Sequence, residues 1–170
     1  MSISRDIINA CQGRDTDDAV SALQRQHGKH ATAFIAEQAG LSARQALRYA
    51  KGEVKNMNPE VVQAIENAVT PGMYAADALA DATFIDCGTV EVQYDGKSAG
   101  TRVVGRLTVT GEMRELMEQA GACYADGEED EGDRLMSEAI LGGYAQSKGD
   151  SFDAVSALDV SGFQGRFSLT

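Results

Sequence analysis

The sequence predicts an α+β protein: an all-helical N-terminal helix-turn-helix domain followed by a small acidic domain of order β-β-α-α-β. Two observations lead to this class. Apolar residues recur at the 3.6-residue helical spacing through the first half, and two runs with strand-like alternation follow the Pro-Gly at residues 71–72. We therefore expect a helical domain over residues 1–70, a linker over 71–82 and an α+β domain over 83–170.

Charge divides the chain at the same place. Residues 1–70 hold eight Lys or Arg and eight Asp or Glu, whereas residues 71–170 hold seven and eighteen and so carry the whole net charge of -11. An acidic second half repels a polyanion at long range. Nucleic acid is therefore expected to bind the first half only.

Helix-start and helix-stop residues divide the first half. Asp15–Asp18 form a polar break and a plausible helix start. Gly40 and Gly52 are typical helix-ending glycines, and Ser42 is a good N-cap. The expected helices are residues 5–27 (one helix or two), 31–39, 43–51, and a last one that Asn58 caps and Pro59 begins.

The second half begins with alternating runs over 83–96 and 101–111, which predict an antiparallel hairpin closed by residues 95–100. Helices are expected over 111–127 and 128–147, and one or two strands within 152–170. A domain of this size buries its helices and sheet poorly alone. We therefore expect a homodimer that shares the sheet.

The stretch "AGLSARQALRYAKGEVK", residues 39–55, has the pattern of a helix-turn-helix. That motif needs a small residue where its helices cross, a glycine with positive φ at the turn, and an aliphatic residue just after it. Ala36, Gly40 and Leu41 meet these needs. Ala46 and Tyr49 are expected to point inward from the second helix.

Basic residues crowd this stretch of an acidic chain. Five of the fifteen Lys and Arg residues are Lys29, Arg44, Arg48, Lys51 and Lys55. A recognition helix places its first residues at base edges in the major groove, so Arg44 is expected to contact a base, most often guanine. Arg48 can reach a base or a phosphate, and the two following lysines suit phosphates. The predicted DNA-binding set is Thr32, Ser42, Ala43, Arg44, Arg48, Lys51 and Lys55.

The segment "IAEQAGLSARQALRYAKGEVK" resembles the helix-turn-helix of the telomere terminal proteins of linear actinobacterial chromosomes and plasmids. In that family a glycine–aliphatic–serine turn leads to an R-Y-x-K-G element and a further basic residue. Arg48, Tyr49, Lys51, Gly52 and Lys55 match that element here. Downstream, "RLTVTGEMRELMEQAGACYADGEEDEGDRLMSEAILGGYAQS" is similar to the family's strand and two helices, and "SALDVSGFQGRFSL" occupies the place of its last strands.

The resemblance implies a protein that binds replicon ends and primes DNA synthesis from a side-chain hydroxyl. The family's priming threonine lies shortly before the L-T-V strand. Ser98 and Thr101 are the only hydroxyl residues in the segment that precedes that strand here. The alternative interpretation is that both are ordinary polar residues of a turn.

Other chemistry finds little support in the sequence. His27 and His30 have a spacing that suits a metal on a helix, but no Asp, Glu or Cys within a turn completes the set, and no phosphate-loop motif is present. We expect no metal, no cofactor and no enzymatic activity. Three widely spaced cysteines favour reduced thiols, and no apolar segment predicts a membrane span or secretion. We expect a cytoplasmic, nucleoid-associated protein.

Three functions stay open. The first is a sequence-specific duplex DNA-binding protein of a plasmid, phage or linear replicon, acting as a regulator or maintenance factor. The second is a terminal protein in which Ser98 or Thr101 becomes joined to DNA. The third is a structural or interaction protein in which the helical hairpin is only a scaffold. In each case the acidic domain is expected to dimerise or to bind a replication or other protein partner.

Overall fold

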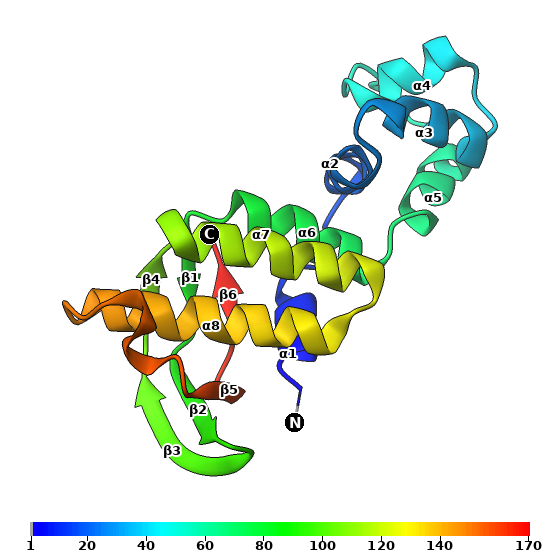
Figure 1. The fold of residues 1–170 in the computed structure, drawn as a ribbon. Coiled ribbons are helices and arrows are strands. Elements are labelled where there is room, and N and C mark those ends of the chain that lie inside the picture. The colour runs from blue at the N-terminus through cyan, green and yellow to red at the C-terminus, as the bar shows by residue number, and fades with distance from the viewer. Residues whose placement is uncertain (1) are drawn as a thin grey trace.

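The computed structural model describes residues 2–170, which fold into two lobes, the smaller projecting from one end of the larger (Figure 1). The helical lobe is residues 16–69, and the mixed lobe is residues 2–11 together with 71–170. Each lobe has its own apolar core. The α+β class predicted from the sequence is confirmed.

The helical lobe packs its helices around one small core. Asp15 caps the first helix by accepting a hydrogen bond of 2.9 Å from the backbone N–H of Asp18, and Asn58 caps the last by accepting one of 2.9 Å from Glu60. Both caps were expected from the sequence. The elements are α2 (Thr16–His27), the short 3₁₀ helix η1 (Gly28–His30), α3 (Ala31–Ala39), α4 (Ala43–Ala50) and α5 (Pro59–Asn67).

The mixed lobe packs three long helices against a bent antiparallel sheet (Figure 1). Its helices are α1 (Ser4–Ala10), α6 (Pro71–Asp81), α7 (Gly111–Asp126), α8 (Glu129–Ser147) and the 3₁₀ helix η2 (Phe152–Val155). Its strands are β1 (Phe84–Asp86), β2 (Thr89–Tyr94), β3 (Lys97–Val103), β4 (Arg106–Thr108), β5 (Asp159–Gln164) and β6 (Ser168–Leu169).

The six strands are three chain segments, each broken once. The strand orders β4-β1-β6 and β3-β2-β5 place the same segments in the same order in two small sheets. The breaks fall at Gly88, Gly105 and Gly165, whose φ angles are 54°, 67° and 110°. Glycine adopts such angles without a Cβ clash, so all three segments bend. The predicted β-β-α-α-β order is confirmed at the level of the three segments.

The hairpin turn is shorter than predicted. Only Asp95 and Gly96 form it, with φ of 48° and 71°, a backbone that suits a tight two-residue turn. Lys97 and Ser98, expected in the turn, already belong to β3 and pair with Tyr94 and Gln93. The sequence interpretation was wrong because it treated the small polar residues after the Asp-Gly as loop.

The predicted linker at 71–82 is also wrong, because most of it forms helix α6. Thr70 caps this helix, accepting 3.2 Å from the N–H of Met73, and Pro71 occupies its first turn. Pro is favoured there, so the Pro-Gly pair starts a helix. Small residues then let α6 lie close to α7: a Cβ atom built on Gly121 would lie 2.8 Å from the Cα of Ala76.

Helix α1 corrects the expected boundary of the first domain. Ile3, Ile7 and Cys11 are buried in the core of the mixed lobe. The Asp133 carboxylate on α8 also holds this end of the chain, accepting hydrogen bonds of 3.0 Å from the N–H of Ile3 and 2.6 Å from the hydroxyl of Ser2. Apolar spacing correctly predicted a buried helix face, but spacing does not say which core receives it.

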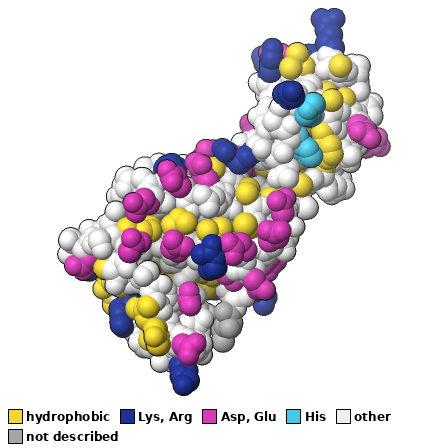
Figure 2. All heavy atoms as spheres, in the orientation of Figure 1, with side chains coloured by type: hydrophobic (Ala, Val, Ile, Leu, Met, Phe, Trp, Pro, Cys, Tyr) yellow, Lys and Arg dark blue, Asp and Glu magenta, His cyan; other side chains and the backbone are white. Residues whose placement is uncertain are grey.

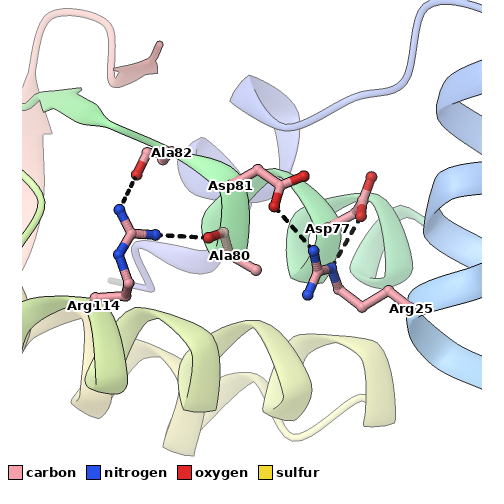
Figure 3. A network of polar contacts seen from close by, with 6 residues as sticks. All are labelled: Arg25, Asp77, Ala80, Asp81, Ala82 and Arg114. Carbon is pink, nitrogen blue, oxygen red and sulfur yellow. Dashed lines mark hydrogen bonds and ion pairs between the residues drawn. The ribbon is translucent and has the colours of Figure 1, made fainter. Parts of the chain in front are cut away.

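Two arginines hold helix α6 (Figure 3): Arg25 from the helical lobe, and Arg114 from within the mixed lobe. Arg25 on α2 forms ion pairs of 3.0 Å with Asp77 and with Asp81 on α6. Arg114 on α7 donates to the carbonyls of Ala80 at 2.7 Å and Ala82 at 2.9 Å, which satisfies backbone acceptors where α6 ends. Helix α6 is therefore held from both lobes.

Candidate nucleic-acid interface

The turn between α3 and α4 has the geometry that the motif requires. Gly40 has φ 64° and ψ 35°, in the left-handed region. Space around it is open, so the backbone angle and not crowding favours glycine here. The N–H of Leu41 donates to the carbonyl of Ala36 at 2.9 Å, which closes the end of α3. The predicted positive φ at Gly40 is confirmed.

Helix α4 begins with a reciprocal capping box. The N–H of Gln45 donates to the Ser42 hydroxyl at 3.2 Å, and the N–H of Ser42 donates to the Gln45 side-chain oxygen at 3.1 Å. The predicted cap is therefore present. The Ser42 hydroxyl also lies 3.2 Å from the same Gln45 oxygen, so its hydrogen-bonding capacity is used within the protein. The sequence pattern Ser-x-x-Gln is typical of a capping box. The sequence interpretation predicted the Ser42 cap but not the hydrogen bond that the Gln45 side chain accepts.

One side of α4 faces the core and the other faces solvent. Ala46 is fully buried, and Tyr49 and Ala50 are half-buried against the core, as expected. The Tyr49 hydroxyl accepts a hydrogen bond of 3.2 Å from the N–H of Asn58. The Ala50 carbonyl accepts one of 3.2 Å from Gln24 on α2. These contacts fix the rotation of α4 about its axis and tie down the loop that follows it.

The solvent side of α4 and this loop carry what we call the basic face: Arg44, Arg48, Lys51 and Lys55. All four side chains are exposed. Within residues 2–170, no Asp or Glu lies within ion-pair distance of any of them. Figure 2 shows Lys and Arg side chains at the end of the helical lobe that points away from the mixed lobe. None of these four positive charges is therefore in an ion pair within residues 2–170, although exposed Glu53 lies between the two lysines in the sequence.

The remaining predicted DNA-binding residues lie at the edges of this surface. Ala43 is exposed in the first turn of α4. Thr32 lies on a different helix, half-buried in the first turn of α3. Because η1 runs directly into α3, the start of that helix is not a free end. Thr32 therefore differs from the other members of the set, which are exposed and lie on α4, at its N-cap or in the loop after it.

The two candidate priming hydroxyls lie on β3, the edge strand of its sheet. Thr101 is opposite Glu91 of β2, and Ser98 is opposite Gln93, with an irregularity of register between the two pairs. These four residues lie on the side of the sheet that faces away from the core. They line a shallow hollow of about 400 Å³ together with Gly100 and Ser161. Both hydroxyls are exposed, and Ser98 lies on the strand and not in the turn that the sequence suggested.

The mixed lobe carries the acidic surface. Figure 2 shows Asp and Glu side chains spread over the face formed by α7 and α8. Arg134 on α8 is partly neutralised there by ion pairs of 2.7 Å with Glu131 and 3.1 Å with Glu138. The two charge regions therefore occupy different lobes.

Neither histidine belongs to an acidic or thiol cluster among the described residues. Residues 2–170 bring together no three His, Cys, Asp or Glu side chains in metal-binding geometry. The His27 ring stacks on Phe34 with a centroid separation of 3.9 Å, and its Nε2 atom is buried without a hydrogen-bond partner. His27, the last residue of α2, is therefore part of the packing between α2 and α3.

No protein-family model, curated protein or solved structure matches the chain. Within residues 2–170, no helix is both long and apolar enough to cross a membrane.

Proposed function

We propose that the protein is a sequence-specific duplex DNA-binding protein and that α4 enters the major groove. The observation that carries this proposal is the basic face: four exposed Lys and Arg side chains without acidic partners, on a chain of net charge -11. Unpaired cations on one rigid surface attract a polyanion and release its counterions. The rest of the chain supplies little such attraction.

The geometry of α4 supports the assignment of roles. A helix of eight residues is about 12 Å long, and its width suits the major groove of B-DNA. Arg44 lies in the first turn, where a recognition helix meets base edges, and its guanidinium can donate two hydrogen bonds to guanine. Arg48 follows one turn later. Lys51 and Lys55 lie beyond the helix, and we assign them to flanking phosphates.

The lobes divide the work under this proposal. The helical lobe binds DNA, and the acidic mixed lobe faces away and receives a protein partner or a second copy. The burial problem that motivated a sheet-sharing homodimer is largely solved within one chain, because α6, α7 and α8 cover the sheet. Edge strand β3 remains available for pairing. A regulator or maintenance factor of a plasmid, phage or linear replicon, associated with the nucleoid, fits this arrangement.

The proposal is tested by fluorescence anisotropy of the intact protein with duplexes drawn from a random-sequence pool, at two salt concentrations. We expect salt-dependent binding, lost in Arg44→Ala and Arg48→Ala and retained in Arg166→Ala. Arg166 is a matched control, because it is an exposed arginine of the mixed lobe. Absence of binding at low salt, or equal losses in all three variants, would show that the helical hairpin is only a scaffold.

A second candidate function rests on the hollow beside β3. An exposed Thr101 hydroxyl lies in register with the Glu91 carboxylate, a group able to accept its proton. Paired with a DNA polymerase, Thr101 Oγ would attack the α-phosphorus of a deoxynucleoside triphosphate. An O–P bond would form, the bond to pyrophosphate would break, and the hydroxyl proton would pass to Glu91 or to water. The family resemblance motivates this step.

This second function has its own readout. Protein incubated with a labelled deoxynucleotide and the host polymerase fraction should keep the label through denaturation. Thr101→Val should abolish the retained label if Thr101 is the site, and Ser98→Ala should abolish it if Ser98 is. Label retained by both single variants and by their combination would overturn the assignment. DNA binding by the helical lobe is measured separately and does not depend on this outcome.

A further inference from the structure

Leu47 is an exposed leucine on α4, beside the cations of the basic face. Its side chain is 42% exposed, and it stands outside both apolar cores of the described chain. It follows Arg44 by three residues and precedes Arg48 by one and Lys51 by four. On a helix this spacing puts the side chains on one side, so Leu47 is an apolar patch among three cations.

Packing does not explain a leucine at this position. The rotation of α4 is already fixed by buried Ala46 and by the hydrogen bonds of Tyr49 and Ala50. Scattered exposed leucines are common on protein surfaces, so exposure alone carries no meaning. What distinguishes Leu47 is its place on the helix side that the proposed function turns toward the bases.

We infer that Leu47 contacts the C5-methyl group of a thymine and so makes thymine a required base of the target site. This inference rests on the proposed function. In the major groove, thymine alone among the four bases presents a methyl group, and apolar side chains recognise it. Leu47 has no polar atom to offer a base edge, so a methyl group is the contact that its chemistry permits.

The helix spacing places this thymine relative to the other predicted contact. Three residues of α-helix advance about 4.5 Å along the axis, and neighbouring base pairs are about 3.4 Å apart. Leu47 therefore lies one to two base pairs from the base that Arg44 contacts. The predicted half-site contains a guanine and, within two base pairs, a thymine.

Uracil tests the contact directly, because it differs from thymine only by that methyl group. A preferred duplex is first selected from a random pool with the intact wild-type protein, and each thymine in turn is then replaced by uracil. We expect one replacement near the guanine to weaken wild-type binding about three- to fivefold, the value of burying one methyl group. Leu47→Ala should bind the thymine and uracil duplexes equally.

Met57→Ala is the matched control, since Met57 is another exposed apolar residue of the helical lobe, 38% exposed, but lies in the loop after α4. It should keep the thymine preference. If wild type binds every uracil duplex as well as its thymine parent, while Arg44→Ala still loses affinity, the Leu47 inference is wrong and the DNA-binding proposal stands. Absence of duplex binding by wild type would overturn both.

Discussion

The Nε atom of Arg25 lies 3.0 Å from Oδ1 of Asp77, and this ion pair joins the helical lobe to the mixed lobe (Figure 3). The Asp77 side chain is only 16% exposed, whereas Asp81, the second partner of Arg25, is 71% exposed. Water therefore screens the Arg25–Asp81 ion pair more than the Arg25–Asp77 ion pair. The contact between α2 and α6 fixes the direction in which the basic face points.

Arg25→Ala should lower the free energy of unfolding by about 1 kcal/mol, the upper range for a partly exposed ion pair. A double-mutant cycle in urea isolates the coupling energies. The Arg25–Asp77 coupling should exceed the Arg25–Asp81 coupling, because water screens the exposed pair more strongly. Arg14→Ala, an exposed arginine outside the ion pairs of residues 2–170, serves as the control. Equal couplings would contradict this account.

Gly121→Ala should destabilise the protein by about 2 kcal/mol, although alanine is the better helix former. The new Cβ would lie 2.8 Å from the Cα of Ala76, so α6 and α7 would have to separate. Gly143→Ala on α8 is the matched substitution. Its Cβ would meet the flexible end of Met113 at 2.8 Å, which can move aside. We expect the Gly143 variant to stay within about 1 kcal/mol of wild type in urea unfolding, and a similar loss in both would be evidence against the helix-crossing explanation.

Local features of the fold were predictable because neighbouring residues decide them. The caps at Asp15, Ser42 and Asn58 and the glycine turn at Gly40 follow from side-chain chemistry within a few positions. The Pro-Gly at 71–72 led to a wrong prediction of a linker, because a Pro-Gly pair is found both at the start of helices and at the points where they end. Contacts distant in sequence, such as the close approach of Gly121 to Ala76 and the burial of Leu79, show that α6 belongs to a packed layer.

The candidate site was predictable to the same extent. Spacing on α4 correctly separated buried Ala46 from exposed Arg44 and Arg48. It did not predict that Tyr49 holds Asn58, or that Arg25 reaches Asp77, because partners far along the chain leave no periodic signal. The turn was expected to extend to residue 100, and the pairing of Thr101 with Glu91 depends on the shorter turn and on the register irregularity between Glu91 and Gln93.

The half-buried Asp133 carboxyl predicts a pH dependence of stability. Burial raises its pKa above the ordinary value of 3.8, although hydrogen bonds from Ser2, Tyr124 and Ile3 act in the opposite direction. The folded protein then binds this proton more tightly than the unfolded chain. Between the raised pKa and 3.8, Asp133 therefore contributes more stability as the pH falls.

Asp133→Asn removes that contribution. Urea unfolding of both proteins from pH 7 down to pH 3.5 gives the difference in free energy of unfolding at each pH. As the pH falls from the raised pKa of Asp133 toward 3.8, we expect the free energy of unfolding of wild type to rise relative to that of Asp133→Asn. A difference that stays constant, or that moves the other way, would mean that burial does not dominate at Asp133.

The thiols should differ in reactivity. Burial raises the pKa of Cys11 and of Cys87 to about 12, so both stay protonated and covered at pH 8. Cys123 is only partly buried, and its pKa is raised by burial and by the neighbouring carboxylate of Glu128. In a titration with a disulfide reagent, one thiol should react slowly in the native protein and all three in urea. Cys123→Ser should remove the native reaction, and a persisting reaction would show that a buried cysteine becomes exposed.

Substitutions of the basic-face lysines should lower the affinity for every duplex, whereas substitution of Arg44 should mainly lower specificity for the preferred site. Lys51→Ala and Lys55→Ala should each lower the slope of log K against log salt by about 0.9 and weaken all duplexes alike, because each removes one phosphate contact. Arg44→Ala should cost about 1–3 kcal/mol on the preferred site and much less on unrelated duplexes. Lys148→Ala, an exposed lysine of the mixed lobe, should change neither quantity. Anisotropy titrations at four salt concentrations measure both effects. If Arg44→Ala weakens every duplex equally, Arg44 contacts a phosphate and the orientation of α4 in the groove must be revised.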